Sequence, residues 1–200
     1  MRPAFMLPLA ACAAILGLSG CTTTVTSGDA TTASSVNTSA VVTSPAATNT
    51  LPGPHPPPND NNNGTSFDPC LAYSAAELKS WGVAPGSVED IANSPGLQRG
   101  CVWYGDGWDV QQTVLNGSVD RFRNQELFPG SEPVVIEGLD AVRWPDEVDP
   151  KRVCYVELPS QRATVGTIVG IRNPQAQRVI PDACAKAMAI ATDTAKKLPK

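Results

Sequence analysis

Cysteine and histidine offer the widest chemistry in this 200-residue sequence, which has six cysteines and one histidine. A serine or cysteine nucleophile in an enzyme needs an imidazole or another base within hydrogen-bonding reach. The one histidine, His55, stands in the run Leu-Pro-Gly-Pro-His-Pro-Pro-Pro, where no neighbouring element fixes its ring. We therefore assign His55 to a solvated linker and predict no catalytic residues.

Cys21 follows a segment with the features of an export signal. Arg2 gives it a positive start, residues 4–18 carry no charge, and small residues precede the cysteine. The apolar run fits a signal peptide and is shorter than the roughly 20 residues that span a bilayer as a helix. Leu18-Ser19-Gly20-Cys21 resembles the bacterial lipoprotein signal, which implies cleavage before Cys21 and a lipid on its sulfur. We expect this lipid to anchor the protein on the outer face of the cell membrane.

Four further cysteines remain in the mature chain, and we expect them to form disulfide bonds. Cys70, Cys101, Cys154 and Cys184 form an even set in an oxidising compartment, which favours disulfides. Four cysteines allow three pairings, and we favour Cys70–Cys101 and Cys154–Cys184 because each bond joins neighbouring elements. Metal binding is the alternative, but these cysteines lack Cys-x-x-Cys spacing and a nearby histidine. We therefore expect no metal and no cofactor.

Three carboxylates, Asp146, Glu147 and Asp149, gather directly after Trp144 and Pro145. A carboxylate pair can hydrolyse a glycosidic bond, and an aromatic ring beside acids can bind sugar. A calcium loop would need an Asp-x-Asp-x-Asp-Gly pattern, which is absent. The simpler interpretation is a solvated loop between two strands.

The charge balance excludes one class of partner. The sequence has 19 acidic and 15 basic residues and a net charge of −4. Nucleic-acid-binding proteins need a basic surface that neutralises phosphates. We therefore expect no nucleic-acid partner.

Composition divides the chain into three parts. Residues 1–20 form the signal peptide, and residues 21–66 are rich in Ser, Thr, Pro and Asn and contain no aromatic residue. A segment of that composition cannot bury enough apolar surface to offset the entropy of ordering it. We predict a disordered tether that begins at the lipidated Cys21, followed by a globular domain over residues 67–200.

Local patterns in the domain predict a helix, several strands and a second helix, in that order. Ser74-Ala75-Ala76-Glu77 is a capping box, and Gly82 ends the helix that it starts. Gly105-Asp106-Gly107 and Gly138 mark hairpin turns. The short connections leave no room for crossover helices, so we predict a two-layer α+β fold with a mainly antiparallel sheet flanked by the two helices. The predicted strands cover residues 101–104, 108–115, 133–137, 140–144, 152–158 and 163–172; a small helix covers 119–127 and the last helix 181–195.

An ordered set of short motifs resembles a family of actinobacterial lipoproteins, the mycobacterial Lpr type, whose domain has no known function. The motifs are Asp68-Pro69-Cys70-Leu71, Ser74-x-x-Glu77-Leu78, Arg99-Gly100-Cys101-Val102-Trp103, Glu137-Gly138-Leu139-Asp140-Ala141 and Val153-Cys154-Tyr155-Val156. The resemblance covers the Cys21 signal and nearly all of residues 67–197. It implies a cell-envelope lipoprotein with paired cysteines and an α+β fold, and it transfers no activity.

Two hypotheses of function follow from these residues. The first is a non-enzymatic binding or interaction module, displayed outside the membrane, whose partner is an envelope protein, a lipid or a glycan. An apolar cavity of several hundred Å³ would favour a carried ligand, and a flat apolar patch would favour a protein partner. The second is a cell-wall-active hydrolase that uses a carboxylate pair at residues 146–149.

Overall fold

The computed structural model of the chain describes residues 56–91 and 96–199. The predicted signal peptide, Cys21, His55 and most of the predicted tether lie outside the described residues. Within the described part, no helix is both long and apolar enough to cross a bilayer.

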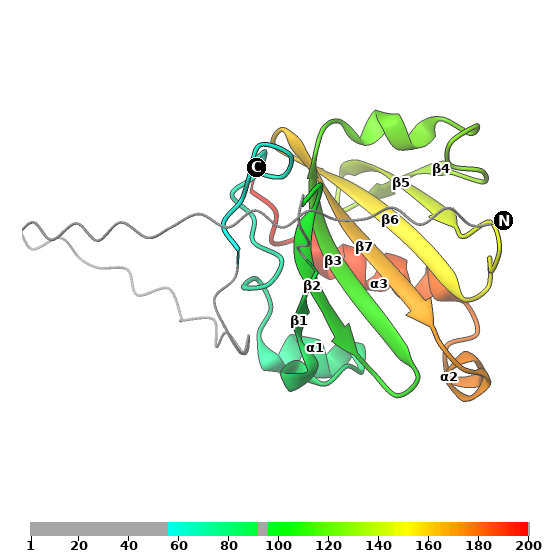
Figure 1. The fold of residues 1–200 in the computed structure, drawn as a ribbon. Coiled ribbons are helices and arrows are strands. Elements are labelled where there is room, and N and C mark those ends of the chain that lie inside the picture. Colours follow the sequence, from blue (N-terminus) through cyan, green and yellow to red (C-terminus); the bar gives the residue numbers. More distant parts are fainter. Residues whose placement is uncertain (1–55, 92–95, 200) are drawn as a thin grey trace, which may run out of the picture. The chain divides into compact units, whose positions relative to one another are not determined.

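Antiparallel strands form one seven-stranded sheet in the described residues, in the order β1-β2-β3-β7-β6-β5-β4 (Figure 1). Hairpins join β2 to β3, β4 to β5 and β6 to β7, and the long pairing of β3 with β7 connects the two halves. The prediction of an α+β fold with an antiparallel sheet is confirmed. The strands are β1 (Glu89–Asp90), β2 (Arg99–Tyr104), β3 (Trp108–Asn116), β4 (Glu132–Ile136), β5 (Leu139–Pro145), β6 (Val153–Ser160) and β7 (Ala163–Ile171).

Helices begin where the sequence supplies capping side chains. In α1 (Ala75–Trp81), Ser74 and Glu77 form the predicted capping box, and Gly82 takes the left-handed conformation at the end. In α3 (Ala183–Ala195), the Asp182 side chain accepts hydrogen bonds from the amides of Cys184 and Ala185. The other helical segments are α2 (Pro174–Val179) and the 3₁₀ turns η1 (Pro85–Ser87) and η2 (Val119–Arg123).

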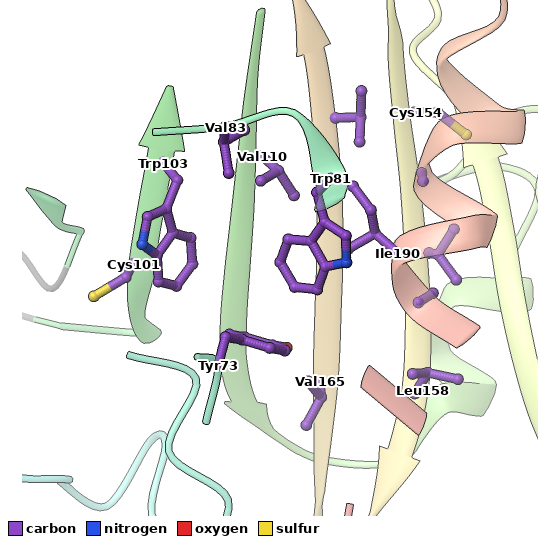
Figure 2. Close-up of a cluster of buried hydrophobic side chains, with 14 of the residues drawn as sticks. Tyr73, Trp81, Val83, Cys101, Trp103, Val110, Cys154, Leu158, Val165 and Ile190 are labelled. Carbon is purple, nitrogen blue, oxygen red and sulfur yellow. The ribbon is translucent and has the colours of Figure 1, made fainter. Parts of the chain in front are cut away.

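One face of the sheet packs against α3 and forms the main core (Figure 2). Small residues at Ala183, Ala187 and Ala191 let the helix approach the strands closely, and Ile190 fills the space between them. Trp81 and Tyr73 enter the same layer from α1 and the segment before it, with their ring centroids 4.6 Å apart. The core therefore holds the N-terminal and C-terminal elements of the domain together.

The opposite face of the sheet has a second, smaller core. Phe122 of η2 stacks on Trp144 of β5 at a centroid distance of 5.1 Å, and Trp144 stacks on Tyr155 of β6 at 5.1 Å. Val119 and Val142 complete this cluster. The connection between β3 and β4 thus covers one end of the outer face.

Both predicted disulfides are present. Cys70–Cys101 joins the segment before α1 to β2, and Cys154–Cys184 joins β6 to the first turn of α3. The Cα atoms of the two pairs are 5.3 and 5.0 Å apart, within the usual range for a disulfide.

The folded domain starts before residue 67, where we placed its boundary. Arg99 is buried and donates hydrogen bonds to three backbone oxygens, those of Asn62 at 3.0 Å, Thr65 at 3.1 Å and Phe67 at 2.6 Å. The Thr65 hydroxyl also lies 2.8 Å from that of Ser160. Residues 59–66 are polar in sequence, but they pack on the sheet because buried partners satisfy their backbone groups.

Three other boundaries differ from the sequence prediction. Pro159 and Ser160 belong to β6 instead of the loop; β6 pairs with β5 only as far as Glu157, so the missing N–H of Pro159 removes no bond to β5. The helix predicted at 119–127 is a 3₁₀ turn that ends at Arg123. Helix α2 was not predicted; Asn173 caps it and Pro174 opens it.

Candidate functional site

An apolar cavity of about 400 Å³ lies where α1, the β2–β3 turn, α2 and α3 meet. The first three of these elements lie at one end of the sheet, and α3 runs across its face (Figure 1). Its lining includes Trp81, Trp108, Ala176, Val179, Ile180 and Lys186. The volume falls in the range of small-molecule sites, about 300–1,000 Å³.

The glycines of the β2–β3 turn place the walls of this cavity. A Cβ atom on Gly105 would lie 2.1 Å from the Trp108 Nε1, so only glycine lets the indole lie across the turn. A Cβ atom on Gly107 would lie 2.1 Å from the Asn173 side chain, which caps α2. Gly107 also has a φ of 74°, which favours glycine. Glycine is therefore required at both positions by the side chains that pack on the turn, and at Gly107 also by the backbone conformation of the hairpin.

Trp81, a second lining residue, is held by contacts with α3 and Tyr73. Its Nε1 donates to the Asp193 carboxylate at 3.0 Å, and its ring packs edge-on against Tyr73. Both Trp81 and Trp108 are nearly buried by the protein alone. Packing within the protein therefore holds both rings in place.

Lys186 brings a positive charge to this apolar surface. Its Nζ lies 5.1 Å from the ring centroid of Trp108, a cation–π contact. Desolvation lowers the pKa of the half-buried ammonium, with no opposing contribution from a carboxylate. Asp106 and Gln175 add polar groups to the lining. Ser, Thr, Cys and His are not among the residues that line the cavity.

The carboxylates predicted for hydrolysis lie elsewhere, beside a second hollow of about 340 Å³ on the outer face. Asp146 Oδ1 accepts hydrogen bonds from the amides of Val148 and Asp149, both at 3.0 Å. Asp149 in turn forms an ion pair with Arg152. These bonds give Asp146 and Asp149 a structural role in their own loop. Asp146 and Glu147 line the hollow, and Asp149 does not.

The aromatic ring beside these acids is covered by other rings. Trp144 is stacked with Phe122 at an interplanar angle of 17° and with Tyr155 at 8°. A ring that binds sugar must present an open face. The geometry at Trp144 therefore favours packing over carbohydrate binding.

One group of candidate metal ligands occurs among the described residues: Cys70, Asp90 and Cys101, whose ligand atoms lie within 4.8 Å of one another. Both sulfurs belong to the Cys70–Cys101 disulfide and cannot ligate as thiolates. The proximity follows from the crosslink.

No motif in the sequence predicted the cavity. The motifs that predicted the fold assign no binding role to Trp81, Trp108 or Lys186. The one local signal was Trp108 directly after Gly105-Asp106-Gly107, a turn in which only Asp106 has a side chain.

Comparison with known proteins gives a family and no activity. No curated protein and no solved structure matches the chain. A family model described as "Protein of unknown function (DUF3558)" matches residues 16–197. The chain therefore belongs to the DUF3558 family of proteins of unknown function.

Proposed function

We propose that this protein is a cell-envelope lipoprotein that binds a small, mainly apolar ligand without chemically changing it. In this proposal Cys21 carries the lipid anchor, residues after it form a tether, and the domain is displayed on the extracytoplasmic face of the membrane. The resemblance to Lpr-type lipoproteins and the Leu18-Ser19-Gly20-Cys21 sequence support the location.

The observation that carries the binding role is the apolar cavity that Trp81 and Trp108 help to line. When an apolar ligand replaces water in a concave apolar site, apolar surface is buried and the free energy of the complex is lowered. A lipid or another apolar small molecule fits this lining better than a glycan does, because a glycan would need more hydrogen-bonding groups than Asp106, Gln175 and Lys186 supply.

Filling the cavity tests the binding role. Ala176 lines it and is buried, so Ala176→Leu adds volume inside. The matched control is Ala189→Leu, which makes the same change at an exposed position of α3. The probe is N-phenyl-1-naphthylamine, a neutral dye that fluoresces in apolar sites. We expect it to bind the wild-type chain and the control equally and the Ala176 variant at least about tenfold more weakly.

Two results would argue against a ligand site: no dye binding by the wild-type chain, or equal binding by both alanine variants. Circular dichroism of each variant separates a filled cavity from a misfolded domain. If the Ala176 variant does not fold, Val179→Trp at the exposed rim of the cavity serves as the blocking change.

The location has a separate test. Cys21→Ala should leave the chain unprocessed or release it from the membrane fraction, because the residue that receives the lipid is gone. Fractionation together with intact mass measurement detects either outcome. A mass that differs from the wild type only by the substitution, with an unaltered membrane fraction, would refute lipidation at Cys21.

A further inference from the structure

We propose that the ligand is an organic anion: an apolar body that fills the cavity, with a carboxylate or phosphate group bound by Lys186. This inference rests on the proposed function and names the class of its ligand. The observation behind it is an ammonium group in a mainly apolar lining that forms no ion pair with a described carboxylate. The one acidic residue of the lining, Asp106, is exposed to solvent and forms no ion pair with Lys186.

The carboxylates nearest to Lys186 in sequence are engaged elsewhere. Asp182 accepts from the amides of Cys184 and Ala185 at 2.8 and 3.2 Å, which caps α3. Asp193 accepts from Trp81 and pairs with Lys196. In residues 56–91 and 96–199 no carboxylate forms an ion pair with Lys186.

The surroundings of Lys186 favour an anion over a neutral polar group. Its stem lies among apolar lining residues, and the Trp108 ring occupies one side of the ammonium. A half-buried charge loses hydration that its neighbours replace only in part. An anionic group in the cavity would restore that interaction as a charge-assisted hydrogen bond, while Gln175 can donate a second bond from the lining.

Trp81 and Trp108 define the rest of the ligand. Two indole walls and the side chains of α2 surround a volume of about 400 Å³, so the body of the ligand is aromatic or an acyl chain. Together, the lining selects an amphiphilic anion of small-molecule size. A free inorganic anion would leave the apolar walls without a partner.

Two dyes distinguish the contribution of a negative charge to binding affinity from that of the apolar body. 8-Anilinonaphthalene-1-sulfonate and N-phenyl-1-naphthylamine share one ring system, and only the first carries a negative charge. Both are titrated into the purified full chain and into two variants, Lys186→Met and Lys79→Met. Methionine keeps an apolar stem of similar length and removes the charge, and Lys79 is an exposed residue outside the cavity.

We expect the ratio of sulfonate to neutral-dye affinity to fall about tenfold in the Lys186 variant, with neutral-dye affinity within about twofold of wild type. The Lys79 variant should behave as the wild-type chain does. An unchanged ratio in the Lys186 variant would overturn the anion proposal and leave the apolar binding site intact. Binding of neither dye by the wild-type chain would overturn both proposals.

A measurement on the wild-type chain alone covers the case in which the Lys186 variant does not fold. Decanoate and decanol have the same chain length, and each is used to displace the bound neutral dye. Stronger displacement by decanoate supports the anion site. Equal or weaker displacement by decanoate contradicts it.

Discussion

The hydroxyl of Tyr73 lies 2.8 Å from that of Thr194, although 121 residues separate them in the sequence. Thr194 Oγ1 also lies 3.4 Å from Gln112 Oε1, and the Gln112 amide donates to Thr167 at 3.0 Å. A continuous polar network therefore runs through the apolar core from the segment before α1, through α3, to β3 and β7. Every member is buried, so each hydrogen bond replaces one that water would make in the unfolded chain.

Removing the Tyr73 hydroxyl tests this network. Tyr73→Phe deletes one buried hydrogen bond and keeps the ring that packs on Trp81. We expect a loss of about 1 kcal/mol in the free energy of unfolding, measured by urea denaturation. Tyr104→Phe is the control, because the Tyr104 hydroxyl bonds to Glu89 at an exposed position; its effect should stay within about 0.5 kcal/mol. Equal losses in the two variants would contradict a special role for the buried network.

Glu157 makes the stability of the domain depend on pH. The side chain is buried on β6, and desolvation raises its pKa from 4.5 to about 7, against the opposing effects of a hydrogen bond from Thr164 and the charge of Arg121. The folded state thus binds this proton more tightly than the unfolded state does. The stabilisation is complete below about pH 4.5 and is lost as the pH rises through about 7, a difference of about 3 kcal/mol.

Glu157→Gln should remove most of this pH dependence, since the amide stays neutral at every pH. Urea denaturation at pH 5 and pH 8.5 measures it: the wild-type chain should lose more stability than the variant between the two values. Glu126→Gln, at an exposed position, should keep the wild-type profile. A Glu157 variant with the same slope as wild type would show that other groups titrate.

Sequence patterns predicted the parts of the fold that depend on neighbouring residues. The capping box at Ser74, the end of α1 at Gly82 and the turn at 105–107 are local signals, and the structure has all three. The pairing of β3 with β7 depends on residues about fifty positions apart, and no local pattern encodes it. The same limit applies to the cavity, since the role of Lys186 depends on where Trp108 and α2 lie.

The position at which the folded domain starts can be tested by comparing the stability of two truncated chains. A chain that begins at residue 57 keeps the carbonyls of Asn62 and Thr65 that accept from Arg99, whereas one that begins at residue 67 loses both. Removing partners from a buried guanidinium leaves its donors unsatisfied, so we expect the shorter chain to be less stable by about 3 kcal/mol or more. Comparing the urea midpoints of the two chains measures the difference. Equal midpoints would restore the boundary at residue 67.

The Cys154–Cys184 disulfide connects the stability of the domain to the cavity. It closes a loop with a sequence separation of 30 residues, so Cys154→Ala with Cys184→Ala should cost about 3–4 kcal/mol. Cys184 is two residues from Lys186, and the bond fixes the first turn of α3 to β6. Its loss should therefore weaken binding of the sulfonate dye more than binding of the neutral dye, because the ammonium is no longer held beside Trp108.

The matched control for this prediction is the pair Cys70→Ala with Cys101→Ala. That disulfide has nearly the same separation, 31 residues, and should cost a similar free energy. It joins the segment before α1 to β2 and does not hold α3, so the ratio of the two dye affinities should stay close to wild type. A fall in the ratio for both pairs would mean that general loosening of the domain, and not the position of Lys186, controls anion binding.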